Sequence, residues 1–263
     1  MVNIDGTKTL LEVCKEEKVK SFIYTSSASV VYSGAPLVNV DETIPYPQKF
    51  ADYYSETKAI AEKMCLAANS PSGMKTLAIR PSGIFGPGDA QTTPGALIAQ
   101  KKNFPVLLQV GNNTALFDFT YVDNIVDAHI SASDLLSSSH NTQIQGQAFF
   151  ITNGQPIGMW SFLRLIWAQV GDTRKPLIII PNIIATFILY FLKLLACIGV
   201  VKHEVPFVFG MTFTSRYFNI TKAKTLLNYS PRISYAQGVP IAVKSCLERW
   251  KSQDPGSSDK KTN

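Results

Sequence analysis

Residues 52–63 read DYYSETKAIAEK, and the segments on either side of this stretch are best understood from it. Tyr54 precedes Lys58 by four residues, so on an α-helix both side chains lie on one face, one turn apart. The pattern predicts a helix over roughly residues 51–68. It also presents two alternatives, an ordinary exposed helix face or a pair of side chains that transfers a proton.

Short apolar runs lie on both sides of this helix. Residues 22–25 and 77–80 are rich in β-forming side chains and typical of strands buried on both faces of a parallel sheet. Residues 147–152 (QAFFIT) predict a third strand. The alternation of helix and strand predicts an α/β fold with a Rossmann-like, doubly wound parallel sheet.

Composition limits the classes of protein that the chain can belong to. The 263 residues are 46% hydrophobic and 17% charged, which excludes wholesale disorder. The net charge of +6 fits an anionic membrane surface or ligand, and no basic stripe interleaved with aromatic residues indicates nucleic acid. The four scattered cysteines form neither a zinc motif nor a disulfide framework, so no metal is expected. They are Cys14, Cys65, Cys197 and Cys246.

The second half of the chain contains a long apolar segment. Over residues 176–201 the single charged side chain is Lys193. The part from 183 to 201 approaches the roughly 20 residues that a transmembrane helix needs. Two interpretations are open: a segment that spans or inserts into a membrane, and a helix buried in a second lobe.

Tyr54 and Lys58 have the chemistry of a general acid or base. A free tyrosine has a pKa of about 10, and a neighbouring ammonium group lowers the pKa by stabilising the phenolate. Ser27 follows the strand at 22–25, and ligands of open α/β sheets bind at that end of the strands. We therefore expect the Ser27 hydroxyl to face the Tyr54–Lys58 pair and to bond a reacting oxygen.

Four ordered motifs carry a family resemblance. YTSSASVVY, DYYSETKAIAEK, LAIRPSGIFGPGD and FDFTYVDNIVDAHISA together resemble the extended short-chain dehydrogenase/reductase family. The resemblance implies a catalytic triad of Ser27, Tyr54 and Lys58, with Tyr53 as the competing tyrosine. It also implies an NAD or NADP cofactor, whose nicotinamide side would be bound by Tyr54 and Lys58 and by Pro81 and Ile84 of the next loop.

Within that family the motifs TSSASVVY and DYYSETK resemble the 3β-hydroxysteroid dehydrogenase group, above all its decarboxylating sterol-4α-carboxylate branch. The resemblance implies oxidation of a sterol 3β-hydroxyl to the ketone, followed by loss of the 4α-carboxylate as CO2. The alternatives are a 3β-hydroxysteroid dehydrogenase/isomerase, a non-catalytic membrane-bound partner of sterol enzymes, and a nucleotide-sugar epimerase or dehydratase, against which the apolar segment argues.

The glycine-rich turn of a dinucleotide-binding fold, such as G-x-x-G-x-x-G, is not present in the sequence. Compared with the family, the chain starts after the first half of the sheet, and we expect a truncated N-terminal half. Two further expectations follow: weak dinucleotide binding by this polypeptide alone, and an unpaired apolar strand edge at residues 22–24.

These features give a predicted domain organisation and location. Residues 1–158 are expected to form a partial NAD(P)-binding domain, 159–251 a mainly helical substrate lobe, and 252–263 a disordered tail. Lys260 and Lys261 resemble the dilysine retrieval signal of the endoplasmic reticulum. The expected location is the endoplasmic reticulum membrane with the catalytic part facing the cytosol, near other sterol-synthesis enzymes.

Overall fold

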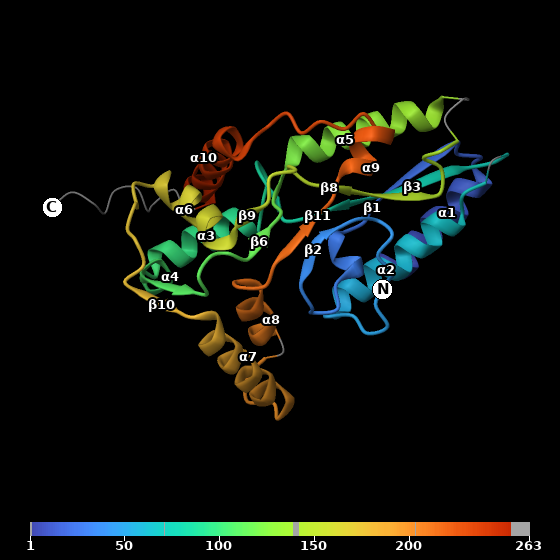
Figure 1. The fold of residues 1–263 in the computed structure, drawn as a ribbon. Helices are drawn as coiled ribbons and strands as arrows, with labels where there is room; N and C mark the ends of the chain where they lie inside the picture. Colours follow the sequence, from blue (N-terminus) through green and yellow to red (C-terminus); the bar gives the residue numbers. More distant parts are fainter. Residues whose placement is uncertain (1, 71, 139–141, 203, 254–263) are drawn as a thin grey trace. The chain divides into compact units, whose positions relative to one another are not determined.

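The structure, a computed structural model, describes residues 2–70, 72–138, 142–202 and 204–253. The chain forms two compact units (Figure 1). The first consists of Met1–Ser82, Asp123–Pro156 and Thr214–Arg232, and the second consists of Gly83–Val122, Ile157–Phe213 and Ile233–Asn263. The units thus interleave along the sequence, whereas the sequence-based boundaries divided the chain at residues 158 and 251.

The first unit is an α/β layer structure. A parallel sheet in the order β1-β3-β8 has α2 on one face and α5 and α9 on the other (Figure 1). A second parallel pair joins β2 to β11. The elements are η1 (Val2–Gly6), α1 (Thr7–Glu16), β1 (Ser21–Thr25), η2 (Ala28–Val31), β2 (Leu37–Val40), α2 (Tyr53–Ala67), β3 (Lys75–Pro81), α5 (Val122–Ser137), β8 (Gln147–Ile151), β11 (Arg216–Phe218) and α9 (Thr221–Leu226).

The three-stranded sheet confirms the predicted α/β class. Thr25 of β1 lies beside Ile79 of β3, and Ile79 lies beside Phe149 of β8. Every residue of β3 after Lys75 is buried, as expected for a central parallel strand. Among the described residues β1 pairs with β3 alone, so its other edge has no strand beside it.

Local sequence explains where α2 begins and which face it buries. Asp52 has an extended backbone, and its Oδ1 atom accepts a hydrogen bond of 2.8 Å from the Ser55 amide, which is an N-cap. Small side chains at Ala61 and Cys65 allow close packing of the helix on the sheet, where both are fully buried. Thr76 on β3 donates a 2.8 Å hydrogen bond to the Cys65 carbonyl and ties the two elements together.

The spacing of apolar residues in the sequence predicts an N-terminal helix with Leu10, Leu11, Val13 and Cys14 on its inner face. In the structure this helix is α1, where Leu11 is buried, Leu10 and Val13 are exposed and Cys14 is half-buried. In the turn before Tyr229, Asn228 adopts a left-handed φ of 52°, a conformation that asparagine tolerates better than most residues.

The second unit is mainly helical, with short strand pairs. β5 pairs with β10 and β4 with β7 in parallel, and β6 pairs with β9 in antiparallel. Its elements are β4 (Ile84–Phe85), α3 (Thr92–Lys101), α4 (Phe104–Leu107), β5 (Leu108–Val110), β6 (Leu116–Phe117), β7 (Thr120–Tyr121), β9 (Ile157–Gly158), α6 (Met159–Ala168), β10 (Ile178–Ile180), α7 (Asn182–Cys197), α8 (Glu204–Met211) and α10 (Tyr235–Gln253).

Aromatic rings fill the core of the second unit. The rings of Phe119 and Phe162 stack with centroids 3.7 Å apart, and Phe85 meets Phe162 edge-on at 5.2 Å. Gly238 of α10 lies against Tyr121, where a Cβ atom would come within 2.5 Å of the ring. Only glycine therefore permits this approach of α10 to β7.

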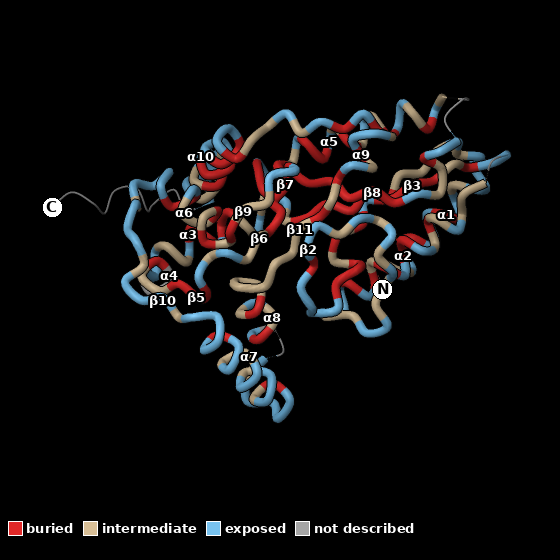
Figure 2. The backbone as a smooth tube through the Cα atoms, viewed as in Figure 1, coloured by how far each residue is buried: buried red, intermediate tan, exposed pale blue. Residues whose placement is uncertain are grey.

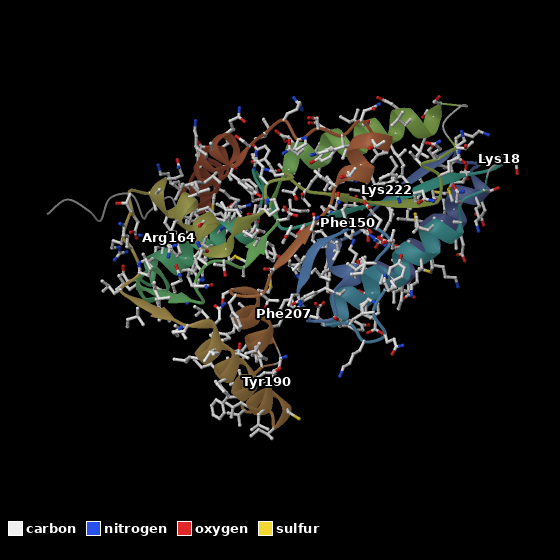
Figure 3. The ribbon with its side chains drawn as sticks, in the orientation of Figure 1. Lys18, Phe150, Arg164, Tyr190, Phe207 and Lys222 are labelled. Carbon is white, nitrogen blue, oxygen red and sulfur yellow. The ribbon has the colours of Figure 1, made fainter. Side chains whose placement is uncertain are left out.

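Helix α7 contrasts with this core, because most of its large side chains face solvent (Figure 2). Ile183 and Phe187 keep 73% of their surface exposed, and Tyr190 keeps 65% (Figure 3). In the part of the chain that the structure describes, no helix is both long and apolar enough to traverse a bilayer. Residues 254–263, with Lys260 and Lys261, lie outside the described residues, while Ser252 and Gln253 end α10.

Candidate active site

Ser27 lies just beyond the C-terminal end of β1. Its backbone is extended, and its Oγ atom caps the short helix η2 by accepting a 3.2 Å hydrogen bond from the Ser29 amide. The two hydroxyl oxygens of Ser27 and Ser29 lie 2.9 Å apart. The sequence predicts Ser27 at this end of the strand, and the structure agrees. The contacts with Ser29 fix the position of the Ser27 hydroxyl.

Tyr54 lies in the first turn of α2, and its phenol forms a hydrogen bond with the Ser27 hydroxyl. The sequence leaves Tyr53 as the competing tyrosine, and the contact with Ser27 is an observation in favour of Tyr54. Tyr54 as a whole residue keeps 53% of its surface exposed. The predicted partners Ser27 and Tyr54 are therefore brought together at a place that a ligand can reach.

The pKa of Tyr54 is raised, which is opposite in direction to the expected effect of a neighbouring ammonium group. Burial of the phenol is the largest cause, the hydrogen bond from Ser27 lowers the pKa, and the negative charge of Asp52 raises it. At neutral pH the phenol is therefore protonated.

Lys58 follows Tyr54 by one helical turn and bonds a different group. Its Nζ atom donates a 2.9 Å hydrogen bond to the Thr25 carbonyl oxygen and lies 4.9 Å from the centre of the Tyr24 ring. Burial lowers the pKa of the Lys58 amine, and the carboxylate of Glu62 opposes that shift. Tyr54 thus contacts Ser27 and Lys58 contacts Thr25, two residues apart at the C-terminal end of β1.

A buried ion pair behind Lys58 was not predicted. The Arg80 guanidinium on β3 donates to both carboxylate oxygens of Glu62 on α2 at 2.7–3.1 Å, and both side chains are almost fully buried. The Tyr46 hydroxyl donates a 2.5 Å hydrogen bond to the same carboxylate. A signal existed in the sequence, because an arginine that ends an apolar strand requires a buried partner.

A second unpredicted set of contacts fixes the start of α2. Asn3 of η1 donates a 3.0 Å hydrogen bond to the Thr57 hydroxyl, which donates in turn to the Tyr54 carbonyl at 3.0 Å. Asn3 thus connects, through Thr57, to the backbone of the candidate tyrosine. This chain of bonds holds the first turn of α2 in register.

The two residues predicted on the nicotinamide side belong to different units. Pro81 ends β3, two residues beyond the partner of Thr25, and is buried in the first unit. Ile84 begins β4 in the second unit, and its side chain is 43% exposed.

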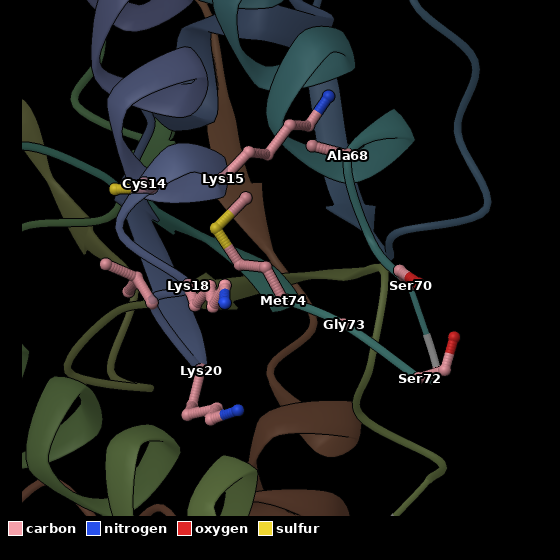
Figure 4. Close-up of a pocket in the computed structure, with 10 residues that line it drawn as sticks. Cys14, Lys15, Lys18, Lys20, Ala68, Ser70, Ser72, Gly73 and Met74 are labelled. Atoms are coloured by element: carbon pink, nitrogen blue, oxygen red, sulfur yellow. The ribbon is translucent and has the colours of Figure 1, made fainter.

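The donor groups near the end of β1 suit the riboside part of a nicotinamide dinucleotide. A lysine ammonium has three N–H donors, and among the described residues one N–H of Lys58 bonds the Thr25 carbonyl oxygen. The others can bind ribose hydroxyls. A hollow of about 420 Å³ lies at the opposite end of β1, where Lys15, Lys18 and Lys20 line it, and is separate from this site (Figure 4).

Comparisons with known proteins agree with this geometry. The 3-beta hydroxysteroid dehydrogenase/isomerase family matches residues 1–182. A decarboxylating sterol-4-alpha-carboxylate 3-dehydrogenase of Schizosaccharomyces pombe is 43% identical over 245 residues, which cover 90% of this chain and 69% of the relative.

Solved structures show the same fold at lower identity. The dTDP-glucose 4,6-dehydratase of Bacillus anthracis in complex with NAD has a TM-score of 0.65 at 18% identity, covering 95% of this chain and 68% of its own. RMD of Pseudomonas aeruginosa complexed with NADPH has a TM-score of 0.61 at 18% identity, covering 95% and 73%. These likenesses confirm the Rossmann-like fold.

Proposed function

Because the chain belongs to the 3-beta hydroxysteroid dehydrogenase/isomerase family, we propose that it oxidises a sterol 3β-hydroxyl with NAD or NADP and releases a 4α-carboxylate as CO2. The observation that carries the proposal is the hydrogen bond between Ser27 and Tyr54, with Lys58 one turn further along α2. The Schizosaccharomyces pombe relative is named for this dehydrogenation and decarboxylation.

In this proposal Tyr54 takes the proton of the substrate hydroxyl, and Ser27 binds the substrate oxygen. The Tyr54 phenolate, a minor form at neutral pH whose share grows as the pH rises, accepts the proton of the substrate hydroxyl, and the Ser27 hydroxyl donates a hydrogen bond that stabilises the negative charge on the substrate oxygen. When bound, the nicotinamide cofactor supplies the hydride acceptor. Tyr54, Lys58 and Pro81 are the residues of the first unit that we assign to its nicotinamide side, and Ile84 stays an expectation from the sequence.

Loss of the carboxylate follows from the chemistry of the product. The new 3-ketone is β to the carboxylate, so the electrons of the breaking carbon–carbon bond pass into an enolate as CO2 leaves. A proton from solvent or from an acidic side chain then restores the ketone. No residue beyond those that oxidise the alcohol is required for this step.

The proposal is tested by supplying the purified protein with a 4α-carboxysterol and, separately, with a 3β-hydroxysteroid that lacks the carboxylate. A 4α-carboxysterol should yield equal amounts of reduced nicotinamide and CO2, measured by absorbance and by trapping of labelled CO2. Removal of the general base typically lowers turnover by about 10²–10⁴-fold, which we expect for Tyr54→Phe. The matched variant Tyr53→Phe should keep activity close to that of the unmodified chain.

Other results would select the alternatives. A 3β-hydroxysteroid without the carboxylate that is oxidised and rearranged to a conjugated ketone would favour a dehydrogenase/isomerase. Absence of turnover on both substrates, with binding to other sterol-synthesis enzymes, would favour a non-catalytic partner. Equal loss of activity in Tyr53→Phe and Tyr54→Phe would overturn the assignment of Tyr54.

We further propose that α7 and its neighbouring residues attach the protein to the endoplasmic reticulum membrane, with the catalytic unit facing the cytosol. Exposed apolar side chains on α7 support this, because soluble proteins rarely expose large contiguous apolar patches. Arg174, Lys175, Lys193 and Lys202 accompany the patch, and no acidic residue occurs between residues 173 and 203. That charge balance suits anionic lipid headgroups.

Cys197 at the end of α7 provides a direct test of membrane attachment. Its thiol is exposed, whereas Cys14 in the first unit is half-buried and far from the apolar segment in sequence. Anionic vesicles should slow alkylation of Cys197 by a water-soluble reagent and leave Cys14 unchanged. Phe187→Asp should abolish this protection, and unchanged alkylation of Cys197 with vesicles would contradict the proposal.

A further inference from the structure

The end of β1 is held by side chains from two different helices. The Thr25 carbonyl oxygen accepts the hydrogen bond from Lys58 of α2, while the Thr25 hydroxyl oxygen lies 2.8 Å from Nε2 of His129 on α5. The other ring nitrogen of His129 lies 2.8 Å from the carbonyl oxygen of Ile125. Residues far apart in sequence therefore converge on Thr25.

The geometry determines the direction of these bonds. A carbonyl oxygen only accepts hydrogen bonds, so Nδ1 of His129 carries the proton and donates to Ile125. In the neutral ring Nε2 then accepts a hydrogen bond from the Thr25 hydroxyl.

We propose that His129 is a positioning residue for Lys58, acting through Thr25. Threonine is β-branched and stiff about χ1, so a bond that fixes its hydroxyl also fixes the orientation of its backbone. Thr25 needs such support because it is exposed at the end of β1, which among the described residues pairs on one edge only. His129 thereby directs the Thr25 carbonyl, and the carbonyl directs the Lys58 amine.

Other groups also contact Lys58, and the test must separate their effects. The Tyr24 ring lies under the amine, and Glu62 attracts its positive charge from one turn along α2. Neither contact involves His129. If Tyr24 and Glu62 alone held the amine, changes at His129 would leave Lys58 unaffected.

The reactivity of the Lys58 amine reports its position without requiring catalysis. We would acetylate the protein with trace acetic anhydride and measure each lysine by mass spectrometry, with exposed Lys15, Lys18 and Lys20 as internal references. Loss of one hydrogen bond corresponds to about a 3- to 10-fold change in equilibrium. His129→Ala should therefore raise Lys58 acetylation by about 3- to 10-fold, because the freed amine is more accessible to the reagent.

Two matched variants test whether His129 acts on Lys58 through Thr25. His129→Gln places an amide near the position of Nε2 and should restore slow acetylation of Lys58. Thr25→Val removes the hydroxyl at nearly constant shape and should raise acetylation as His129→Ala does. The double variant should show no further increase, because both changes break the same contact.

Unchanged acetylation of Lys58 in His129→Ala, or additive increases in the double variant, would overturn the inference. Its catalytic consequence rests on the proposed function. In an active protein His129→Ala should lower kcat/KM for the nicotinamide cofactor by about the same 3- to 10-fold. A protein without turnover that still shows the acetylation pattern would refute the function and leave the positioning role intact.

Discussion

Lys58 donates its hydrogen bond to the backbone carbonyl of Thr25, over a distance of 2.9 Å. One turn earlier on the same helix, Tyr54 bonds the hydroxyl of Ser27, two residues beyond Thr25. Lys58 and Tyr54, spaced i, i+4 on α2, therefore contact Thr25 and Ser27, which are spaced i, i+2 at the end of β1. The spacing along α2 matches that path, and a shift of either segment would separate both pairs together.

Ser27→Ala should move the pH dependence of oxidation upward. The Ser27 hydrogen bond lowers the pKa of Tyr54, so its loss leaves burial and Asp52 to raise the pKa further. Because the phenolate is the base, kcat/KM should fall about 3- to 10-fold at neutral pH and recover in part at higher pH. Ser26→Ala is the matched control, since that hydroxyl has no hydrogen-bond partner among the described residues. An unchanged pH profile in Ser27→Ala would contradict this role.

Glu62→Gln should destabilise the first unit severely. The change leaves the buried Arg80 guanidinium without its countercharge, which typically costs about 3–5 kcal/mol. Urea denaturation measures the loss. Glu12→Gln breaks an exposed ion pair with Lys8 and should cost less than about 1 kcal/mol. Similar midpoints for both variants would show that the buried pair contributes little.

Tyr24 should make the fold sensitive to alkali. Burial raises the pKa of Tyr24 to about 12, above the value of about 10 in an unfolded chain. A raised folded pKa gives stability that is fully present below pH 10 and is lost as the pH rises toward 12. Absorbance of the phenolate, followed with circular dichroism, should show late ionisation of Tyr24 accompanied by unfolding. Tyr24→Phe should diminish this alkaline step.

The four thiols should react in two classes. Cys197 is exposed and Cys14 half-buried, whereas Cys65 and Cys246 are buried. Burial also raises the pKa of Cys65 to about 12, so very little thiolate forms at neutral pH. Alkylation of the native protein, mapped by mass spectrometry, should modify Cys197 first, with Cys65 and Cys246 reacting only after unfolding. Early modification of Cys65 would show that α2 opens readily from the sheet.

Much of the catalytic unit could be predicted because its signals are local. The four-residue spacing from Tyr54 to Lys58 lies within one helix, and short apolar runs marked β1 and β3. The sequence also placed Ser27 at the strand end, since parallel strands present their C-terminal residues at one edge.

The remaining features depend on contacts between distant residues. The pair of Thr25 and His129 joins positions 104 residues apart, and the bond between Arg80 and Tyr46 joins positions 34 apart. The direction of the Tyr54 pKa shift was wrong in the sequence-based expectation because it depends on burial, which spacing does not reveal. The interleaving of the two units also follows from contacts that no local pattern encodes.

Asp52 begins helix α2 through its carboxylate oxygens and, by the same charge, raises the pKa of Tyr54. An asparagine at this position would keep an oxygen for the Ser55 amide while removing the charge. Asp52→Asn would therefore lower the pKa of Tyr54 and shift the pH optimum of the protein toward acid, while Ser27, Tyr54 and Lys58 stay unaltered.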